Sequence, residues 1–252
     1  MQSDQKKPLP GGGPAAARPI RSVPADKNDV STKPGAQKFL QLAEKNEALQ
    51  EVQNSILSAI SNLIECRNNI ADNHVERIER FLALLMNEML RRGVYRDVLG
   101  TWDIKLFLQS ARLHDVGKIG VRDSILMKDG PLTQEEFAEM KKHTTFGEMI
   151  IEKIQRHARE SVFLTHAKII AGTHHERWDG SGYPRGIAGS SIPLQGRLMA
   201  IVDVYDALTS ERPYKRAFPP DRAVQIIKTG SGIQFDPALI DSFTGASEWF
   251  HK

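Results

Sequence analysis

Two adjacent histidines, His174 and His175, run directly into a glycine-rich turn. Neighbouring residues of a helix point about 100° apart, so this pair can serve two metal ions, or one metal ion and a substrate phosphate. The turn reads Asp-Gly-Ser-Gly-Tyr-Pro over residues 179–184. Its glycines permit tight backbone turns, and Pro184 fixes a backbone angle at its end. The stretch therefore predicts a charge centre beside one wall of a substrate site.

A second pair of ligand-type residues, His114-Asp115, ends an apolar segment. A carboxylate in an apolar helix is costly unless it is paired or bound to metal, and Asp115 can bridge two cations. Lys118 lies about one turn further on and can meet a phosphate oxygen. The alternative is a satisfied helix end with Lys118 on the surface.

Further ligand types occur in other helix-like segments, as His74, His143 and Asp203. Asp206 follows Asp203 by one turn, so one carboxylate can bind metal while the other fixes a ligand histidine. Neutral imidazole and carboxylate together suit iron, manganese, nickel or zinc. Three histidines have no ligand-type neighbour and are left out of the site: His157, His166 and His251.

A basic turn follows the segment of Asp203, with Arg212 and Lys215 around Pro213-Tyr214. Both side chains are suited to a second phosphate or to a base. The alternative is a solvated basic turn.

Helical periodicity dominates from about residue 60 to 252, and the alternation typical of strands is absent. Helix-end signals mark this region, namely Gly93 after two arginines, Thr133 with Glu136, and Pro237. We therefore expect an all-α catalytic domain over residues 60–252.

Two segments precede that domain. Residues 1–36 are rich in proline and glycine with thin apolar content, which predicts a disordered tail. Residues 37–59 form a predicted linker helix that continues through Ile64 into the catalytic region. Apolar residues recur in this helix every seven positions, at Leu42, Leu49, Ile56 and Leu63. That partial coiled-coil seam can pack on the chain's own core or form a homodimer.

Composition excludes several classes of protein. The net charge of +3 equals the excess of six basic over three acidic residues in the tail, so no nucleic-acid surface is indicated for the folded part. No apolar run is long enough to span a membrane, and the N-terminus has no signal-peptide core. Cys66 is the single cysteine, which favours a reducing, cytoplasmic location.

The three motifs His114–Gly120, His174–Pro184 and Asp203–Lys215 together resemble the HD-GYP family of cyclic-dinucleotide phosphodiesterases, over about residues 56–244. The resemblance implies an all-helical HD-domain bundle with C-terminal helices and a site holding iron or manganese. The metal ligands it implies are His74, His114, Asp115, His143, His174, His175 and Asp203. It also implies phosphate contacts by Lys118, Arg212 and Lys215, a position for Tyr183 in the substrate loop, and support of the site by Asp206.

One departure from the family pattern affects the metal count. A glutamate that binds a third metal in some members is replaced here by Ile70, which cannot ligate, and the nearby Asp72 is placed off that helix face. We therefore expect two divalent ions. Such a centre is expected to release the linear dinucleotide pGpG, and further hydrolysis to GMP stays open.

The expected reaction is hydrolysis of cyclic di-GMP by a bridging hydroxide that two metal ions activate, with Asp115 between them and Lys118 stabilising phosphoryl charge. Two alternatives remain. The same fold can act on another cyclic dinucleotide such as cyclic GMP-AMP. It can also be a binding and signalling module without turnover, since the linker helix resembles segments that join such domains to an upstream sensory, two-component or GGDEF-type protein.

Overall fold

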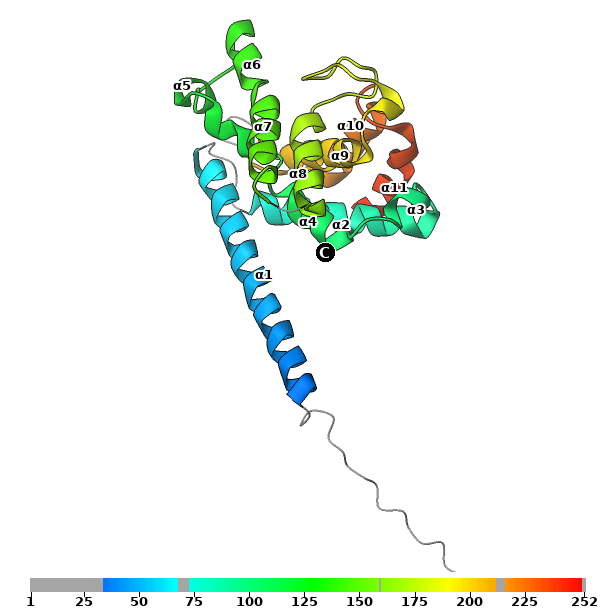
Figure 1. The fold of residues 1–252 in the computed structure, drawn as a ribbon. Helices are drawn as coiled ribbons and strands as arrows, with labels where there is room; N and C mark the ends of the chain where they lie inside the picture. The colour runs from blue at the N-terminus through cyan, green and yellow to red at the C-terminus, as the bar shows by residue number, and fades with distance from the viewer. Residues whose placement is uncertain (1–33, 68–72, 159, 212–215, 251–252) are drawn as a thin grey trace, which may run out of the picture. The chain divides into compact units, whose positions relative to one another are not determined.

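The computed structural model describes residues 34–67, 73–158, 160–211 and 216–250, and within these ranges it contains helices and no β-strand. A single isolated bridge joins Ser231 and Phe235. The predicted all-α fold is therefore confirmed. The elements (Figure 1) are α1 Pro34–Arg67, α2 His74–Arg92, α3 Arg96–Leu99, α4 Ile104–Ala111, η2 Val116–Gly120, α5 Asp123–Leu126, α6 Gln134–Met140, α7 His143–Gln155, α8 Val162–Thr173, η3 Gly189–Ser191, α9 Leu194–Thr209, α10 Pro220–Thr229 and α11 Pro237–Ser247.

The chain divides into two compact units, Met1–Ala48 and Leu49–Lys252. In the first unit the described residues are the helical segment 34–48, and the predicted disordered tail lies almost entirely outside the described residues. In the second unit the helix ends at Arg67, three residues beyond the predicted end at Ile64. The seam residues Leu49, Ile56 and Leu63 are 57%, 53% and 68% exposed, so this stripe does not pack on the described core.

The larger of two apolar cores lies among α2, α4, α9, α10 and α11. The aromatic rings of Phe81, Tyr205 and Phe243 are buried in it, with Phe81 and Tyr205 packed edge to face. The apolar stripe of α2 ends as predicted, because Gly93 adopts φ 77° and its N–H caps the helix. This core fixes α2 against α9, the two helices that carry His74 and Asp203.

A second core packs α7 against α8 and η2, with Ile64 of α1 at its edge. Figure 1 shows α7, α8 and α9 side by side. The approach of η2 to α7 is close, because a Cβ atom added to Gly117 would lie 1.9 Å from the His143 carbonyl oxygen and 2.4 Å from the Gly147 nitrogen. That contact sets the spacing between the His114-Asp115 turn and His143.

Local capping signals are also confirmed. Thr133 and Glu136 form a complete capping box at the start of α6. Pro237 opens α11, where the Asp236 side chain accepts a hydrogen bond from the Ala238 N–H. Within the described residues, no helix combines the length and apolar character that crossing a membrane requires.

The contact at Gly117 generates a stability prediction. Gly117→Ala forces η2 and α7 apart, and we expect it to lower the free energy of unfolding by about 1–3 kcal/mol, as overpacking typically does. Chemical denaturation measures this change. Gly35→Ala in α1 is the control, because nothing lies within 4 Å of the added methyl group. Equal stability of the two variants would contradict the close approach.

Candidate metal centre and adjoining pocket

The predicted ligand residues converge at helix ends. His74 and His143 are the first residues of α2 and α7, and His174 caps the end of α8. Asp115 lies in the turn between α4 and η2 and not inside a helix, which differs from the expectation. Asp203 is the one ligand-type residue in mid-helix, within α9.

Two groups of three side chains could each hold a metal ion. The first is His74, His114 and Asp203, and the second is His143, His174 and His175. In each group the candidate ligand atoms all lie within 4.8 Å of one another. His174 and His175 fall in the same group because α8 ends at Thr173, so the helical separation expected for this pair does not apply. Their ring centroids are 4.0 Å apart.

Asp115 joins the two groups through its two carboxylate oxygens. Oδ2 lies 3.3 Å from His114 Nε2 in the first group, whereas Oδ1 lies 3.4 Å from His143 Nε2 in the second. Oδ2 also accepts a hydrogen bond of 2.6 Å from Lys118 Nζ. Burial opposes ionisation of Asp115, but Lys118 and His114 outweigh it and hold its pKa well below the usual range. The carboxylate is therefore ionised and can bridge two cations.

Backbone carbonyls fix which ring nitrogen faces the site. His143 Nδ1 lies 2.7 Å from the Met140 oxygen, and His114 Nδ1 lies 3.0 Å from the Ala111 oxygen. His174 Nδ1 lies 3.0 Å from the Ile170 oxygen. A carbonyl only accepts, so each Nδ1 carries a proton, and Nε2 of a neutral ring then presents a lone pair. His114 differs from the other two, because burial opposes its charged form but the Asp115 carboxylate outweighs burial and raises the pKa of His114.

The Nε2 atoms of His143 and His174 face one another, and the described part of the chain places no hydrogen-bond donor between the two neutral rings. His143 Nε2 and His174 Nε2 are 3.4 Å apart, while His114 Nε2 and Asp115 Oδ1 are buried with no hydrogen-bond partner among the described residues. Burial lowers the pKa of His174 to about 3, and it also lowers the pKa values of His143 and His175. The neutral rings of His143, His174 and His175 are therefore suited to binding a divalent cation.

Asp206 orients the remaining histidine. Its Oδ2 accepts a hydrogen bond of 2.7 Å from His74 Nδ1, which leaves Nε2 of His74 for the site. Oδ1 accepts a hydrogen bond of 2.5 Å from Arg77 Nε. Burial raises the pKa of Asp206, but the bonds from His74 and Arg77 exceed that effect and lower it. The ionised Asp206 is placed to hold the His74 ring in one orientation.

An open pocket of about 300 Å³ adjoins the histidines and reaches solvent. Its described rim includes three residues that the sequence reasoning did not select, namely Phe137, Lys141 and Gln234. Lys141 Nζ lies 5.2 Å from the ring centroid of Phe137 and 5.9 Å from that of Tyr183. The capping box predicts the start of α6 from the sequence. Only the tertiary fold, however, brings Phe137 of α6 beside the loop that contains Tyr183.

The loop after α8 forms one side of this pocket. Gly182 is required there, because a Cβ atom would lie 2.3 Å from the Arg177 nitrogen. The tight turn presents Tyr183, whose ring centroid is 4.8 Å from that of His175. Buried Glu176 supports the loop by accepting a hydrogen bond of 2.8 Å from the Arg185 N–H. The loop thus links the histidine pair to the pocket wall.

Several predicted features lie outside the described residues. These include the two phosphate contacts Arg212 and Lys215 and the departure at Ile70, so these expectations stay predictions. Of the histidines left out of the site, His157 is exposed, and His166 packs on Trp102 and Phe107 away from both ligand groups.

A comparison with known protein families identifies the family to which this chain belongs. A family model described as HD domain matches residues 58–239, which include every predicted ligand. The chain belongs to the HD domain family. The resemblance to HD-GYP proteins is confirmed at this level. In fold it is similar to an HDG"Y"P protein of Bdellovibrio bacteriovorus, Bd1817, with a TM-score of 0.51, 16% identity, and coverage of 90% of this chain and 75% of that one.

Curated relatives extend the comparison. A Vibrio cholerae protein named cyclic di-GMP phosphodiesterase is 44% identical, over 81% of this chain and 43% of its own length. A second Vibrio cholerae protein, named 3'3'-cGAMP-specific phosphodiesterase 2, is 34% identical, over 77% of this chain and 34% of its own length. The chain therefore spans less than half the length of these two relatives.

The contact between Asp206 and His74 predicts how a substitution of Asp206 changes metal affinity. Asp206→Asn removes the charge that accepts from both His74 and Arg77, and we expect Mn²⁺ affinity to fall about 10–100-fold, as loss of a partner behind a ligand histidine typically does. Calorimetric titration of metal-free protein measures it. The control is Asp241→Asn, at an exposed position of α11, and a matching affinity in both variants would refute the orienting role.

Proposed function

We propose that the protein is a metal-dependent phosphodiesterase that hydrolyses cyclic di-GMP to linear pGpG. The observation that carries the proposal is the bridging position of Asp115 between two buried three-ligand groups, beside an open pocket. The name of the 44% identical relative supports the same substrate and reaction.

The proposed ligands are His74, His114 and Asp203 for one ion and His143, His174 and His175 for the other, with Asp115 shared. Their mixture of imidazole and carboxylate favours iron or manganese, and nickel or zinc is also compatible. When bound, two divalent ions supply Lewis-acid charge for the phosphodiester and a nucleophile from water at neutral pH. The buried, unpartnered atoms of His114 and Asp115 support such occupancy.

Other side chains have separate proposed roles. Lys118, held 2.6 Å from Asp115, brings positive charge to the phosphoryl oxygens as negative charge develops there. Asp206 keeps His74 in its ligand orientation. Arg212 and Lys215 are proposed to contact the second phosphate, as their sequence motif implies.

A base of the substrate is proposed to lie against the aromatic rim. Phe137 is 46% exposed, and its ring centroid lies 6.1 Å from that of Tyr183 in an edge-to-face arrangement. An exposed ring beside a pocket supplies a stacking surface that any purine can use. Lys141, next to both rings, adds positive charge for the phosphate.

Cyclic GMP-AMP is the second candidate substrate, and the name of the 34% identical relative favours it. Stacking on Phe137 does not distinguish guanine from adenine. The two substrates are therefore separated by turnover of each and not by the geometry of the ligand groups.

Metal analysis and turnover test the proposal together. Protein purified without oxygen is expected to contain at least two equivalents of iron or manganese and to convert cyclic di-GMP to pGpG. His114→Ala and Asp115→Ala are expected to lose both bound metal and turnover, because each removes a ligand. His157→Ala, at an exposed histidine, is the control.

The outcomes of that test are distinct. Bound metal with turnover of cyclic GMP-AMP alone would select the second substrate. Bound metal without turnover of either dinucleotide would contradict the enzyme and leave a binding and signalling module.

The aromatic rim generates a kinetic prediction. Phe137→Ala is expected to raise KM about tenfold with little change in kcat, because the lost stacking surface lies away from the ligand groups. Phe137→Trp keeps an aromatic face and should restore KM. A fall in kcat at unchanged KM would refute a role in substrate binding.

A homodimer through α1 is a separate proposal. The exposed seam of Leu49, Ile56 and Leu63 has heptad spacing, which is typical of a helix that pairs with a second copy. Ile56→Asp is expected to shift the protein from dimer to monomer in light scattering, whereas Gln50→Asp, off the seam, leaves the dimer intact. A wild-type protein that is monomeric in light scattering would exclude the proposed homodimer. The upstream signalling partner and the cytoplasmic location stay predictions.

A further inference from the structure

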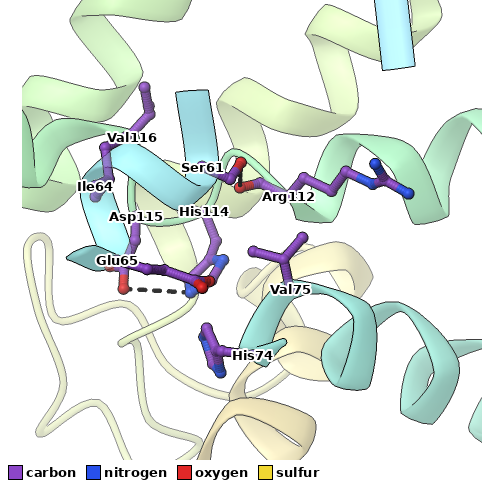
Figure 2. A pocket seen from close by; sticks show the side chains of 9 residues that line it. All are labelled: Ser61, Ile64, Glu65, His74, Val75, Arg112, His114, Asp115 and Val116. Carbon is purple, nitrogen blue, oxygen red and sulfur yellow. Dashed lines mark hydrogen bonds and ion pairs between the residues drawn. The ribbon is translucent and has the colours of Figure 1, made fainter. Parts of the chain in front are cut away.

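Glu65 lies one helical turn after Ser61 in α1, in the last part of that helix, and lines a small cavity together with His74, His114 and Asp115. Figure 2 shows its side chain directed toward the same space as the rings of His114 and His74. The sequence predicts a linker in this helix and contains no signal that assigns a role to Glu65. In the structure it is part of the wall of the metal centre.

The end of α1 is held in this position by specific contacts. Ser61 Oγ donates a hydrogen bond of 2.9 Å to the Arg112 carbonyl oxygen, which lies just before His114. Ile64 is 7% exposed and packs in the core formed with Leu113 and Val116. The backbone that carries Glu65 is therefore fixed relative to the His114-Asp115 turn.

One oxygen of the Glu65 carboxylate lacks a hydrogen-bond partner among the described residues of this cavity. Its Oε1 atom is buried and accepts no hydrogen bond from any residue that the structure describes. Burial raises the pKa of Glu65, and the nearby His74 and His114 oppose that effect. A buried carboxylate oxygen without a donor is costly unless a positive group meets it.

A second unpartnered atom belongs to a residue of the same cavity. His114 is 2% exposed, and its Nε2 atom is buried without a hydrogen bond to any described residue. Glu65 and His114, from two separate segments, thus line one cavity, and each has a buried polar atom to which the described residues offer no hydrogen-bond partner. A divalent cation can bind a carboxylate oxygen and an imidazole nitrogen at the same time.

We infer that Glu65 is a metal-binding residue, whose carboxylate binds a divalent cation at the His74–His114 end of the centre. It lies outside the group in which His74, His114 and Asp203 come within 4.8 Å of one another, so it either adds a ligand at the edge of that group or holds a further ion beside it. The inference rests on the proposed metal centre and not on the identity of the substrate.

This assignment changes the conclusion drawn from Ile70. Loss of a glutamate at that position was expected to limit the site to two ions. Glu65 presents a carboxylate to the same histidine from a position five residues earlier, on α1. The chain therefore has a further carboxylate near the centre, besides Asp115, Asp203 and Asp206.

The test compares Glu65→Gln with Glu51→Gln, the same substitution at an exposed position of α1. Metal-free full-length protein is titrated with Mn²⁺ by calorimetry, and bound metal is counted by elemental analysis after desalting. We expect Glu65→Gln either to lose one equivalent of Mn²⁺ or to weaken one binding step at least tenfold. We expect Glu51→Gln to match the wild type.

A thermal scan separates ligation from a structural role. Without metal, Glu65→Gln should unfold at or above the wild-type temperature, because the change removes an uncompensated buried charge. With Mn²⁺, it should gain less stability than the wild type does. Unchanged stoichiometry and affinity would overturn the inference, as would destabilisation that is the same with and without Mn²⁺. Neither readout uses turnover, so failure to hydrolyse cyclic di-GMP would not affect it.

Discussion

His143 Nε2 and His174 Nε2 lie 3.4 Å apart in a buried environment, and the centre must stabilise this contact between two acceptor atoms. Both Nδ1 atoms donate to carbonyls, so the two Nε2 lone pairs repel one another. A shared proton would relieve that repulsion, but burial keeps the pKa of His174 near 3 and opposes a charged ring. A divalent cation relieves it without protonating either histidine, and ionised Asp115 offsets the cation's charge.

Helix ends explain why the ligands gather where they do. The last turn of a helix leaves backbone carbonyls without helical partners. Ala111, Met140 and Ile170 all lie in such last turns, of α4, α6 and α8, and each accepts from the Nδ1 of a site histidine. The carbonyls of Ala111 and Ile170 also accept a hydrogen bond from the backbone N–H of the same histidine, so the Nδ1 bond is an additional bond at the helix end. In each case it selects the tautomer that can bind metal. His74 is different, since it begins α2, and a carboxylate, Asp206, replaces the carbonyl.

Much of this arrangement can be predicted from the sequence, because the signals depend on residues that are close together in the chain. The stop at Gly93 and the capping box at Thr133 depend on a few neighbouring residues, and the structure has both. The ligand residues were selectable because histidine and carboxylate in apolar helical segments are unusual without a partner. Glu65 and Phe137 were not selectable, because neither differs locally from an ordinary surface residue of a helix. Only the packing of α1 on the His114 turn, and of α6 beside the loop of Tyr183, reveals what each one faces.

His174, His175 and Asp203 belong both to the ligand groups and to the pocket lining, whereas the aromatic rim residue Phe137 lies on a different element, α6. The ligand histidines His74, His114, His143 and His174 are at most 2% exposed and are fixed by the two cores. The rim residue Phe137 is half exposed on α6, a short helix with no fully buried residue. A substitution of Phe137 can therefore change the proposed base site without removing a buried contact of α6.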